Sequence, residues 1–401
     1  MKQTPSSPAL SDVLVLDLSR VLAGPYATMV LADLGAEVIK VERPDRGDDT
    51  RQWGPPWAGG ESAYYLSVNR NKKSVTVDLA TETGRHIVRQ LARQADVLVE
   101  NWRVGKMEAW GLGYEALRDL NPRLVYCAIT GYGQTGPYRD RPGYDFIIQA
   151  QGGGMSITGP AEGPPMKVGV AIVDITAGLF AAITILTALY ERERSGQGQY
   201  LDIALLDSQV AWLANVASIY LVSGERSARY GNAHPNIVPY ELFPTADDWL
   251  AIGVGNDAQW ERLCRLAGWV DLAADHRFAT NPGRVEKRKI LVPILNERFR
   301  KRSSDEWLAA LEAAGIPCSR INNIDQVFSD PQVLAREMLI ELPHPTGGSV
   351  KLAGSPLKLS RTPVAIAQPP PLLGQHTNEI LSKYLNYSPG DLVELRKEGV
   401  I

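Results

Sequence analysis

The sequence predicts an α/β fold in which a large domain with a parallel sheet is joined to a smaller α/β domain. In the first 130 residues, short runs rich in Val, Leu and Ile alternate with segments of helical periodicity. Most of these runs are continuously apolar, as in the strands of a parallel sheet that helices cover on both faces. After residue 225 the order changes to a strand pair followed by helices, which indicates the second domain.

The elements of the large domain follow one another in a β-α-β-α order. Pro25 suits the first turn of one helix, Gly35 suits its end, and Thr81 suits the start of the next helix. Strands are expected over residues 12–19, 36–42, 74–79, 96–101 and 123–130. Helices are expected over residues 24–35, 81–95 and 113–121.

The middle of the chain is expected to be helical. Residues 175–194 and 205–224 form two long apolar segments with a turn and a strand between them, and residues 225–238 form a polar loop. Residues 240–257 have the pattern of a hairpin, and a proline-rich surface segment covers residues 367–377. Further helices are expected near residues 257–268, 284–300 and 303–314.

These elements divide the chain into three parts. We expect a large domain from residues 1–200 plus 330–401, a linker helix over residues 201–225, and a small α/β domain with a glycine loop over residues 226–329.

Composition excludes several classes of protein. The net charge of −3 gives no basic field for nucleic acid. The three cysteines are far apart and form neither a disulfide framework nor a zinc spacing, which fits a reducing compartment. The apolar stretch over residues 175–190 is shorter than a typical membrane span, and the first ten residues lack a signal-peptide core. We therefore expect a cytoplasmic protein with no membrane or nucleic-acid partner.

Two motifs that often carry chemistry do not do so in this chain. The sequence GYGQTG at residues 131–136 matches a dinucleotide fingerprint, but the residues after it do not start a long helix, so we reject a nicotinamide site. The five histidines have no metal-ligand spacing. His86 lies on an amphipathic helix and is expected to be structural, whereas His234, in the polar loop, is a candidate for substrate contact.

Three other segments are candidates for ligand contact. Asn101 and Trp102 follow a predicted strand, and ligands of open α/β sheets bind at such strand ends. Residues 41–51 cluster three arginines, which indicates either a solvated loop or a site for phosphates or carboxylates. The glycine-rich segment at residues 253–257 is either an ordinary turn or a mobile loop that closes over a reactive centre.

Asp174 is a single carboxylate between two apolar runs, and two interpretations fit it. An Asp directly before a long helix is a favoured N-cap, and the helix dipole and backbone N–H groups would keep it ionised. An ionised, partly desolvated carboxylate can also act as a nucleophile. The residue pattern alone favours the cap, and the two roles are compatible.

Six segments together resemble the family III CoA-transferases (the CaiB/BaiF type), in order and with the spacing of that family. Residues 41–51, 64–74, 231–243 and 369–377 further resemble the subgroup that uses succinyl-CoA and glutarate. The segments that carry the family resemblance are LDLSRVLAGPYATMVLADLGAEVIKVERPDRGDDTRQWG, YYLSVNRNKKSVTVDL, VENW, ITGYGQTGP, GYDFIIQAQGGGMSITG and VGVAIVDITAGL.

The resemblance implies a Rossmann-like large domain, an interlocked homodimer and a covalent mechanism. Asp174 stands where the family keeps its catalytic aspartate, which passes through an acyl anhydride and an aspartyl-CoA thioester. No metal or prosthetic group is implied, because CoA is a substrate. Gly253 and Gly255 lie where the family has a loop that shields the intermediate. By the same matching, the CoA site would contain Val21, Ala23, Arg43, Val77, Asn101 and Trp102, and the acyl pocket would contain Arg20, Tyr64, Tyr144, Asp145 and His234.

Departures from the family pattern bear on the alternatives. Arg20 and Leu22 replace the His and Gln of the formyl-CoA:oxalate enzymes, and Ala109 and Trp110 replace an Arg–Met pair that helps to hold CoA there. Arg20 could instead pair with the distal carboxylate of a longer diacid. The related α-methylacyl-CoA racemases carry His where Tyr144 stands, and tyrosine is a poor base at neutral pH. A non-enzymatic acyl-CoA-binding scaffold is the third alternative.

Overall fold

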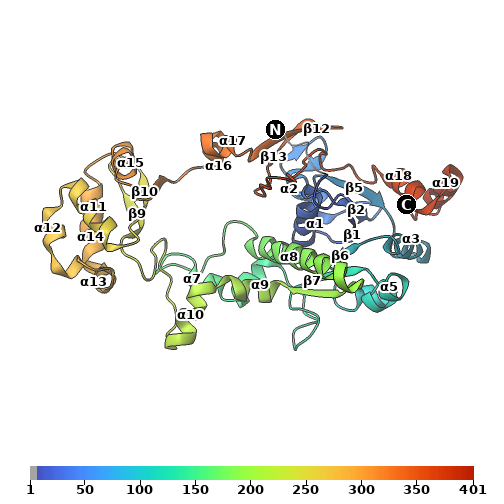
Figure 1. Ribbon diagram of the computed structural model, residues 1–401, viewed down its shortest axis with the longest axis horizontal. Coiled ribbons are helices and arrows are strands. Elements are labelled where there is room, and N and C mark those ends of the chain that lie inside the picture. Colours follow the sequence, from blue (N-terminus) through green and yellow to red (C-terminus); the bar gives the residue numbers. More distant parts are fainter. Residues whose placement is uncertain (1–6) are drawn as a thin grey trace. The chain divides into compact units, whose positions relative to one another are not determined.

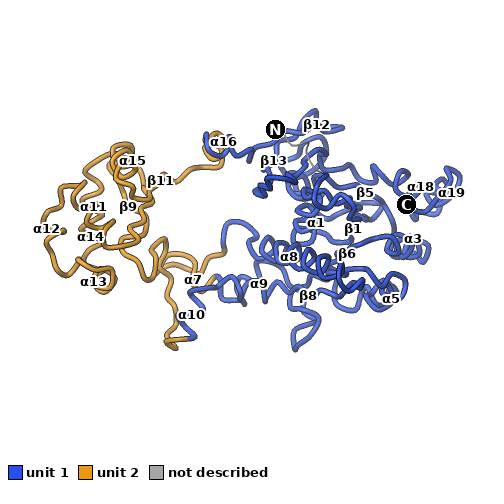
Figure 2. The backbone as a smooth tube through the Cα atoms, viewed as in Figure 1, with its two compact units in different colours: residues 1–154, 168–221, 331–401 blue, residues 155–167, 222–330 orange. Residues whose placement is uncertain are grey.

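The structure, a computed structural model, describes residues 7–401. These residues form two compact units, which Figure 2 distinguishes by colour. The first unit contains residues up to 154 together with residues 168–221 and 331–401, and the second contains residues 155–167 and 222–330. The segment 155–167 thus belongs with the smaller unit, although the sequence had placed it in the large domain.

A six-stranded parallel sheet forms the centre of the first unit (Figure 1). Its strand order is β5-β2-β1-β6-β7-β8, and every neighbouring pair is parallel. The prediction of a parallel sheet is therefore confirmed. The strands are β1 (Leu14–Asp17), β2 (Glu37–Glu42), β5 (Lys72–Thr76), β6 (Val97–Glu100), β7 (Val125–Thr130) and β8 (Tyr200–Ala204).

Helices cover both faces of this sheet because its strands are apolar on both sides. Val15 and Val97 pack on one face with α1 (Ala23–Asp33) and α8 (Ile172–Ser195). Leu16 and Leu98 point to the other face. The helices on that second face are α3 (Glu82–Ala92), α5 (Tyr114–Leu120), α18 (Thr377–Leu385) and α19 (Pro389–Lys397).

Short elements connect these layers, and most of them had no clear sequence signal. They are the 3-10 turn η1 (Asp49–Gln52), β3 (Trp57–Ala58), β4 (Glu61–Ser62), α2 (Ala63–Ser67), α4 (Lys106–Ala109), α6 (Asp145–Gln151), α7 (Gly154–Ile157), α17 (Pro331–Ala335), β12 (Leu339–His344) and β13 (Gly348–Ala353).

The long helix α8 corrects two expectations. It begins at Ile172 and so includes Asp174 in its first turn. Its length and composition also suffice for a membrane span, contrary to the expectation from residues 175–190, and 44% of its most apolar window is buried inside the protein. Because core helices of globular proteins have the same composition, and α8 packs on α1 and the sheet, this helix alone is weak support for a membrane location.

The single linker helix predicted over residues 201–225 is wrong, but the strand predicted before residue 205 is confirmed as β8. The remaining residues form two helices, α9 (Leu205–Trp212) and α10 (Ala214–Ser223), whose axes are bent by 74°. Ala214 lies at the break with a φ of 43°. A non-glycine residue in this left-handed region cannot continue a right-handed helix, so the apolar run is divided there.

The second unit is a small α/β domain with its own aromatic core. Strands β9 (Tyr240–Pro244) and β10 (Trp249–Gly253) form the predicted hairpin, and β11 (Cys318–Arg320) pairs antiparallel with β10. Phe243, Phe299 and Trp307 pack together in the core. The helices are α11 (Asp257–Ala267), α12 (Val270–Ala274), α13 (Asn281–Glu286), α14 (Arg288–Phe299), α15 (Ser304–Ala313) and α16 (Ile324–Ser329), with the 3-10 turn η2 (His276–Phe278).

Candidate active site

A cavity of about 900 Å³ opens at the carboxyl ends of the central strands. The chain runs outward from β1 through β2 to β5, then returns to β6 on the other side of β1 and continues to β7 and β8. The sheet order therefore reverses between β1 and β6, and ligands of open α/β sheets bind at such a point. The lining includes Arg20, Val21, Leu22 and Ala23 after β1, Asn101, Trp102, Arg103 and Lys106 after β6, Gly131, Arg141 and Tyr144 after β7, and Asp174 in α8.

Hydrogen bonds join the two loops on either side of this reversal. Asn101 Oδ1 accepts from the backbone N–H of Arg20 at 2.9 Å, and Asn101 Nδ2 donates to the Arg20 carbonyl at 2.7 Å. The indole N–H of Trp102 donates to the carbonyl of Leu18 at 3.1 Å. These bonds satisfy backbone groups that the ends of the strands would otherwise leave unpaired, and they fix the wall of the cavity.

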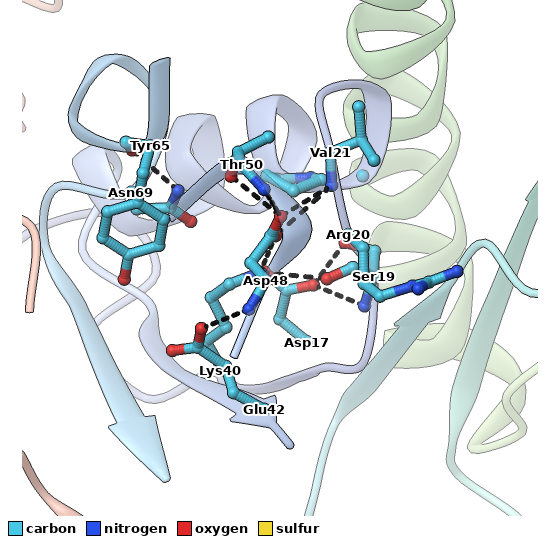
Figure 3. Close-up of polar contacts among 12 residues, drawn as sticks. Asp17, Ser19, Arg20, Val21, Lys40, Glu42, Asp48, Thr50, Tyr65 and Asn69 are labelled. Atoms are coloured by element: carbon cyan, nitrogen blue, oxygen red, sulfur yellow. Dashed lines mark hydrogen bonds and ion pairs between the residues drawn. The ribbon is translucent and has the colours of Figure 1, made fainter. Parts of the chain in front are cut away.

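A network of buried charges lies beneath the same wall (Figure 3). Asp17 pairs with Lys72 at 3.1 Å, and Lys40 pairs with Asp48 at 2.9 Å, with all four side chains almost fully buried. Burial alone raises the pKa of Asp17, but Lys72, Lys40 and the hydroxyls of Ser19 and Thr28 outweigh it and lower that pKa to about 2. Asp17 is therefore ionised, as a buried carboxylate with two cations and two hydrogen-bond donors should be.

A second cavity of about 260 Å³ adjoins the first and shares Arg20, Trp102 and Lys106 with it. The ring centroids of Trp102 and Trp110 are 4.9 Å apart, and Lys106 Nζ lies 4.3 Å from the Trp110 centroid. Arg43 and Val77 also line this cavity. Aromatic and apolar walls beside cations suit a heteroaromatic ring that carries phosphates.

Asp174 lies on the wall of the larger cavity, but it is not the N-cap of α8 as the sequence had suggested. The N-cap position is Ala171, which makes no side-chain cap bond. Asp145 supplies the missing bond, because its Oδ1 accepts from the backbone N–H of Val173 at 2.8 Å. Gln149 holds Asp145 in place by donating to its Oδ2 at 2.7 Å.

The surroundings of Asp174 favour its neutral form more than the sequence had indicated. Burial, followed by repulsion from Asp145, raises the pKa of Asp174 to about 7. Tyr64 interacts electrostatically with this carboxylate. Burial, followed by the negative charge of Asp174, raises the pKa of Tyr64 to about 12. A carboxyl group with a pKa near neutrality is a marker of functional sites, since an ordinary surface Asp has no reason to be so perturbed.

The structure brings most of the predicted site residues in the first unit together. Besides Asp174, the larger cavity is lined by Arg20, Val21, Ala23, Asn101, Trp102 and Tyr144, and the smaller cavity by Arg43 and Val77. Tyr64 packs against the cluster of Leu22, Met29 and Val68, and Leu22 lines the larger cavity. Asp145 does not line the cavity but is buried near enough to Asp174 to repel its charge.

Three predicted residues lie in the second unit. The rings of His234 and Tyr240 are tilted by 58° with centroids 5.4 Å apart, and His234 Nδ1 accepts from the backbone N–H of Asn236. Gly253 and Gly255 join β10 to α11, and neither has a positive φ, so the backbone freedom expected of this loop is not used here. Space is the constraint at Gly253, where an added β carbon would lie 3.1 Å from the Tyr240 ring.

Sequence reasoning missed the buried charges and left the role of three arginines open. Arg43 lines the smaller cavity, whereas Arg46 is exposed and pairs with Asp45. Arg51 lines neither cavity, because its guanidinium is buried between Glu42 and Glu61. Lys40 and Asp48 escaped notice, although a lysine in the middle of the apolar segment EVIKVE was a signal of a buried ion pair.

Comparison with known proteins agrees with this geometry. The family model for CoA-transferase family III matches residues 10–377. The succinyl-CoA:glutarate CoA-transferase of Homo sapiens is 47% identical over 392 residues, which cover 98% of this chain and 90% of that protein. The succinate–glutarate CoA-transferase of Agrobacterium fabrum is 47% identical over 382 residues, covering 94% of this chain and 96% of that protein.

A solved structure supports the same grouping. The crystal structure of a CaiB/BaiF family protein from Brucella suis has a TM-score of 0.85 and 44% identity, and the match covers 94% of this chain and 100% of that chain. The family model spans most of the chain, and the similarity to the human and bacterial enzymes extends over nearly its full length. The chain is therefore a member of CoA-transferase family III.

Proposed function

We propose that this enzyme transfers CoA from succinyl-CoA to a small dicarboxylate such as glutarate, with Asp174 as the nucleophile. The observation that carries the proposal is the position of Asp174 in a cavity that adjoins a second cavity suited to a nucleotide. The relatives from Homo sapiens and Agrobacterium fabrum, named for succinyl-CoA or succinate and glutarate, support this choice of acids.

The first half of the proposed reaction loads CoA onto the enzyme. An Asp174 oxygen attacks the thioester carbon of succinyl-CoA, the C–S bond breaks, and a mixed anhydride and the CoA thiolate result. The thiolate then attacks Cγ of Asp174. The bond between Cγ and the bridging oxygen breaks, succinate leaves, and CoA remains as a thioester of Asp174.

The second half reverses these steps with the acceptor. A glutarate carboxylate attacks Cγ and expels the thiolate, which then attacks the glutaryl carbon of the new anhydride and releases free Asp174. No net proton or redox partner is needed, so we propose that the enzyme works without a metal or prosthetic group. Helix α1 begins at Ala23 on the cavity wall, and its N-terminus would stabilise the negative charge of the thiolate.

Water must be kept from the anhydride during this sequence. The glycine loop at Gly253 and Gly255 is our candidate for the shield, and His234 our candidate for a further substrate contact, both from the second unit. We also propose that Arg20 binds the distal carboxylate of the diacid. Arg20 lines both cavities and is paired with Asp49 at 2.9 Å, so a substrate carboxylate would compete with that residue.

Exposed apolar side chains support a homodimer, which we propose to be interlocked. The outer face of α8 exposes Leu179, Ile183 and Tyr190, and none of the residues of α10 is buried. Large apolar side chains grouped on exposed helices are typical of protein–protein interfaces, and we propose that a second copy of the chain covers them. A cytoplasmic location is likewise our proposal.

The alternative activities predict different results in one experiment. Hydroxylamine, added after succinyl-CoA, should inactivate the enzyme by capturing acylated Asp174, and peptide mass analysis should place the hydroxamate there. An α-methylacyl-CoA racemase would exchange the α-proton in deuterated water, and an acyl-CoA-binding scaffold would do neither. A panel of acceptors including oxalate separates glutarate transfer from formyl-CoA:oxalate-type activity. Asp174→Ala should reduce turnover at least about 10³-fold, and near-normal turnover would refute the proposal.

A further inference from the structure

The loop between β1 and α1 contains a backbone conformation that its sequence does not favour. Val21 has a φ of 71°. In this left-handed region, the β carbon of a branched residue crowds the backbone, so valine is rarely found there. Strained residues persist where the surrounding structure over-determines them, and they cluster at binding and catalytic sites. Val21 lines the larger cavity, so the strain lies on its wall.

Side chains from other segments hold the backbone on both sides of this position. Asp17 Oδ1 accepts from the N–H of Ser19 at 3.0 Å, and Lys40 Nζ donates to the Ser19 carbonyl at 2.9 Å. Asn101 bonds both the N–H and the carbonyl of Arg20. The two residues before Val21 are therefore fixed by β1, β2 and the loop after β6.

Asp48 holds Val21 itself. Its two carboxylate oxygens lie 3.2 and 3.3 Å from the Val21 nitrogen, and it accepts from the N–H of Thr50 at 2.9 Å (Figure 3). Asp48 and Lys40 are 1% and 0% exposed. Removing two charges from water is expensive, and an apolar pair in their place would often be as stable. Fold stability alone thus gives little reason for an ion pair at this position.

We propose that the buried Lys40–Asp48 pair is a positioning device for CoA binding, because it holds Val21 in its left-handed conformation and so keeps the cavity wall preformed. Without the Asp48 carboxylate, Val21 relaxes to a negative φ and moves the backbone that faces the ligand. This inference rests on the proposed function, since it takes the cavity beside Val21 to be the CoA site.

A double-mutant cycle with Val21→Gly tests the inference, because glycine adopts a positive φ without strain. Asp48→Leu keeps roughly the size of the side chain but removes both oxygens that accept from the Val21 N–H. We expect Asp48→Leu to weaken CoA binding about tenfold or more in the chain with Val21, and less than about threefold in the Val21→Gly background. Titration calorimetry with free CoA measures the dissociation constants, and thermal unfolding of each variant is followed in parallel.

Two further variants distinguish a specific loss of CoA binding from general misfolding. Lys40→Met combined with Asp48→Leu replaces the buried ion pair with an apolar pair, and it should show the same dependence on Val21→Gly. Asp96→Leu serves as the matched control, because Asp96 pairs with Arg192 and accepts from the N–H of Leu14 at the opposite end of the strands. Its effect should be the same in both backgrounds.

The outcomes separate this inference from the proposed function. Equal losses of CoA affinity with and without Val21→Gly would overturn the positioning role and leave the proposed function intact. Failure of the unmodified enzyme to bind CoA would instead contradict the proposed function, and the inference with it.

Discussion

Asp145 caps the helix whose first turn carries Asp174, through a bond of 2.8 Å from the backbone N–H of Val173 to Asp145 Oδ1. The same carboxylate raises the pKa of Asp174 by repulsion, second only to burial. One side chain therefore fixes where the proposed nucleophile lies and influences when it is ionised. This arrangement links the geometry of the site to the pH dependence of the enzyme.

We expect Asp145→Asn to move the acidic limb of the pH–rate profile to lower pH. The pKa of Asp174 is about 7, so in the unmodified enzyme the nucleophile is largely protonated below neutrality and the rate rises with pH through that value. An amide at residue 145 can still accept from Val173 but carries no charge, so the pKa of Asp174 should fall. Profiles of kcat/KM against pH measure the shift, and an unchanged midpoint would contradict this account.

Asp174→Asn should stabilise the fold more at pH 8 than at pH 5. The pKa of Asp174 is raised from an ordinary 3.8 to about 7 in the folded chain. Between these values the unfolded chain ionises first, so Asp174 increasingly destabilises the fold as the pH rises through this range. The amide removes that penalty. We expect the gain in Tm over the unmodified protein to be larger at pH 8 by about 2–4 °C.

The control for this measurement is Asp325→Asn. Asp325 is also in the first turn of a helix, α16, but it is exposed. Its substitution should change Tm by nearly the same small amount at both pH values. A pH-independent effect of Asp174→Asn would show that burial of the carboxylate does not perturb it.

Local patterns could predict the sheet and much of the cavity wall, whereas contacts between distant segments could not be predicted. Asn101 and Trp102 were identifiable because they follow a strand, and strand ends gather at one edge of a parallel sheet. The true cap of α8 was hidden, because Asp145 lies 28 positions before Val173 in the chain. The lysine within EVIKVE indicated a buried ion pair, but its partner Asp48 was hidden, since no local pattern shows that the loop after β2 folds back over Lys40.

We expect Arg20→Ala to raise the KM for glutarate about tenfold or more, because a charged hydrogen-bond partner of the distal carboxylate is lost. The guanidinium now pairs with Asp49 and lies 4.3 Å from the centroid of Trp102. A monocarboxylic acceptor such as butyrate is the matched control, since it has no distal carboxylate. If the KM for glutarate stays the same, or if the KM values for glutarate and butyrate rise equally, Arg20 does not bind the distal carboxylate.

Trp110→Ala should raise the KM for succinyl-CoA about tenfold while kcat changes little. Trp110 and Lys106 form one side of the smaller cavity, where we place the nucleotide end of CoA. Stacking of a base on an aromatic side chain contributes about 1–3 kcal/mol, and the thioester reacts in the other cavity, so binding should suffer and chemistry should not. Succinyl-pantetheine, which has no nucleotide, should be insensitive to the substitution. Trp249→Ala, at an exposed tryptophan of the second unit, should leave both substrates unaffected. Equal losses with succinyl-CoA and succinyl-pantetheine would show that the smaller cavity does not hold the nucleotide.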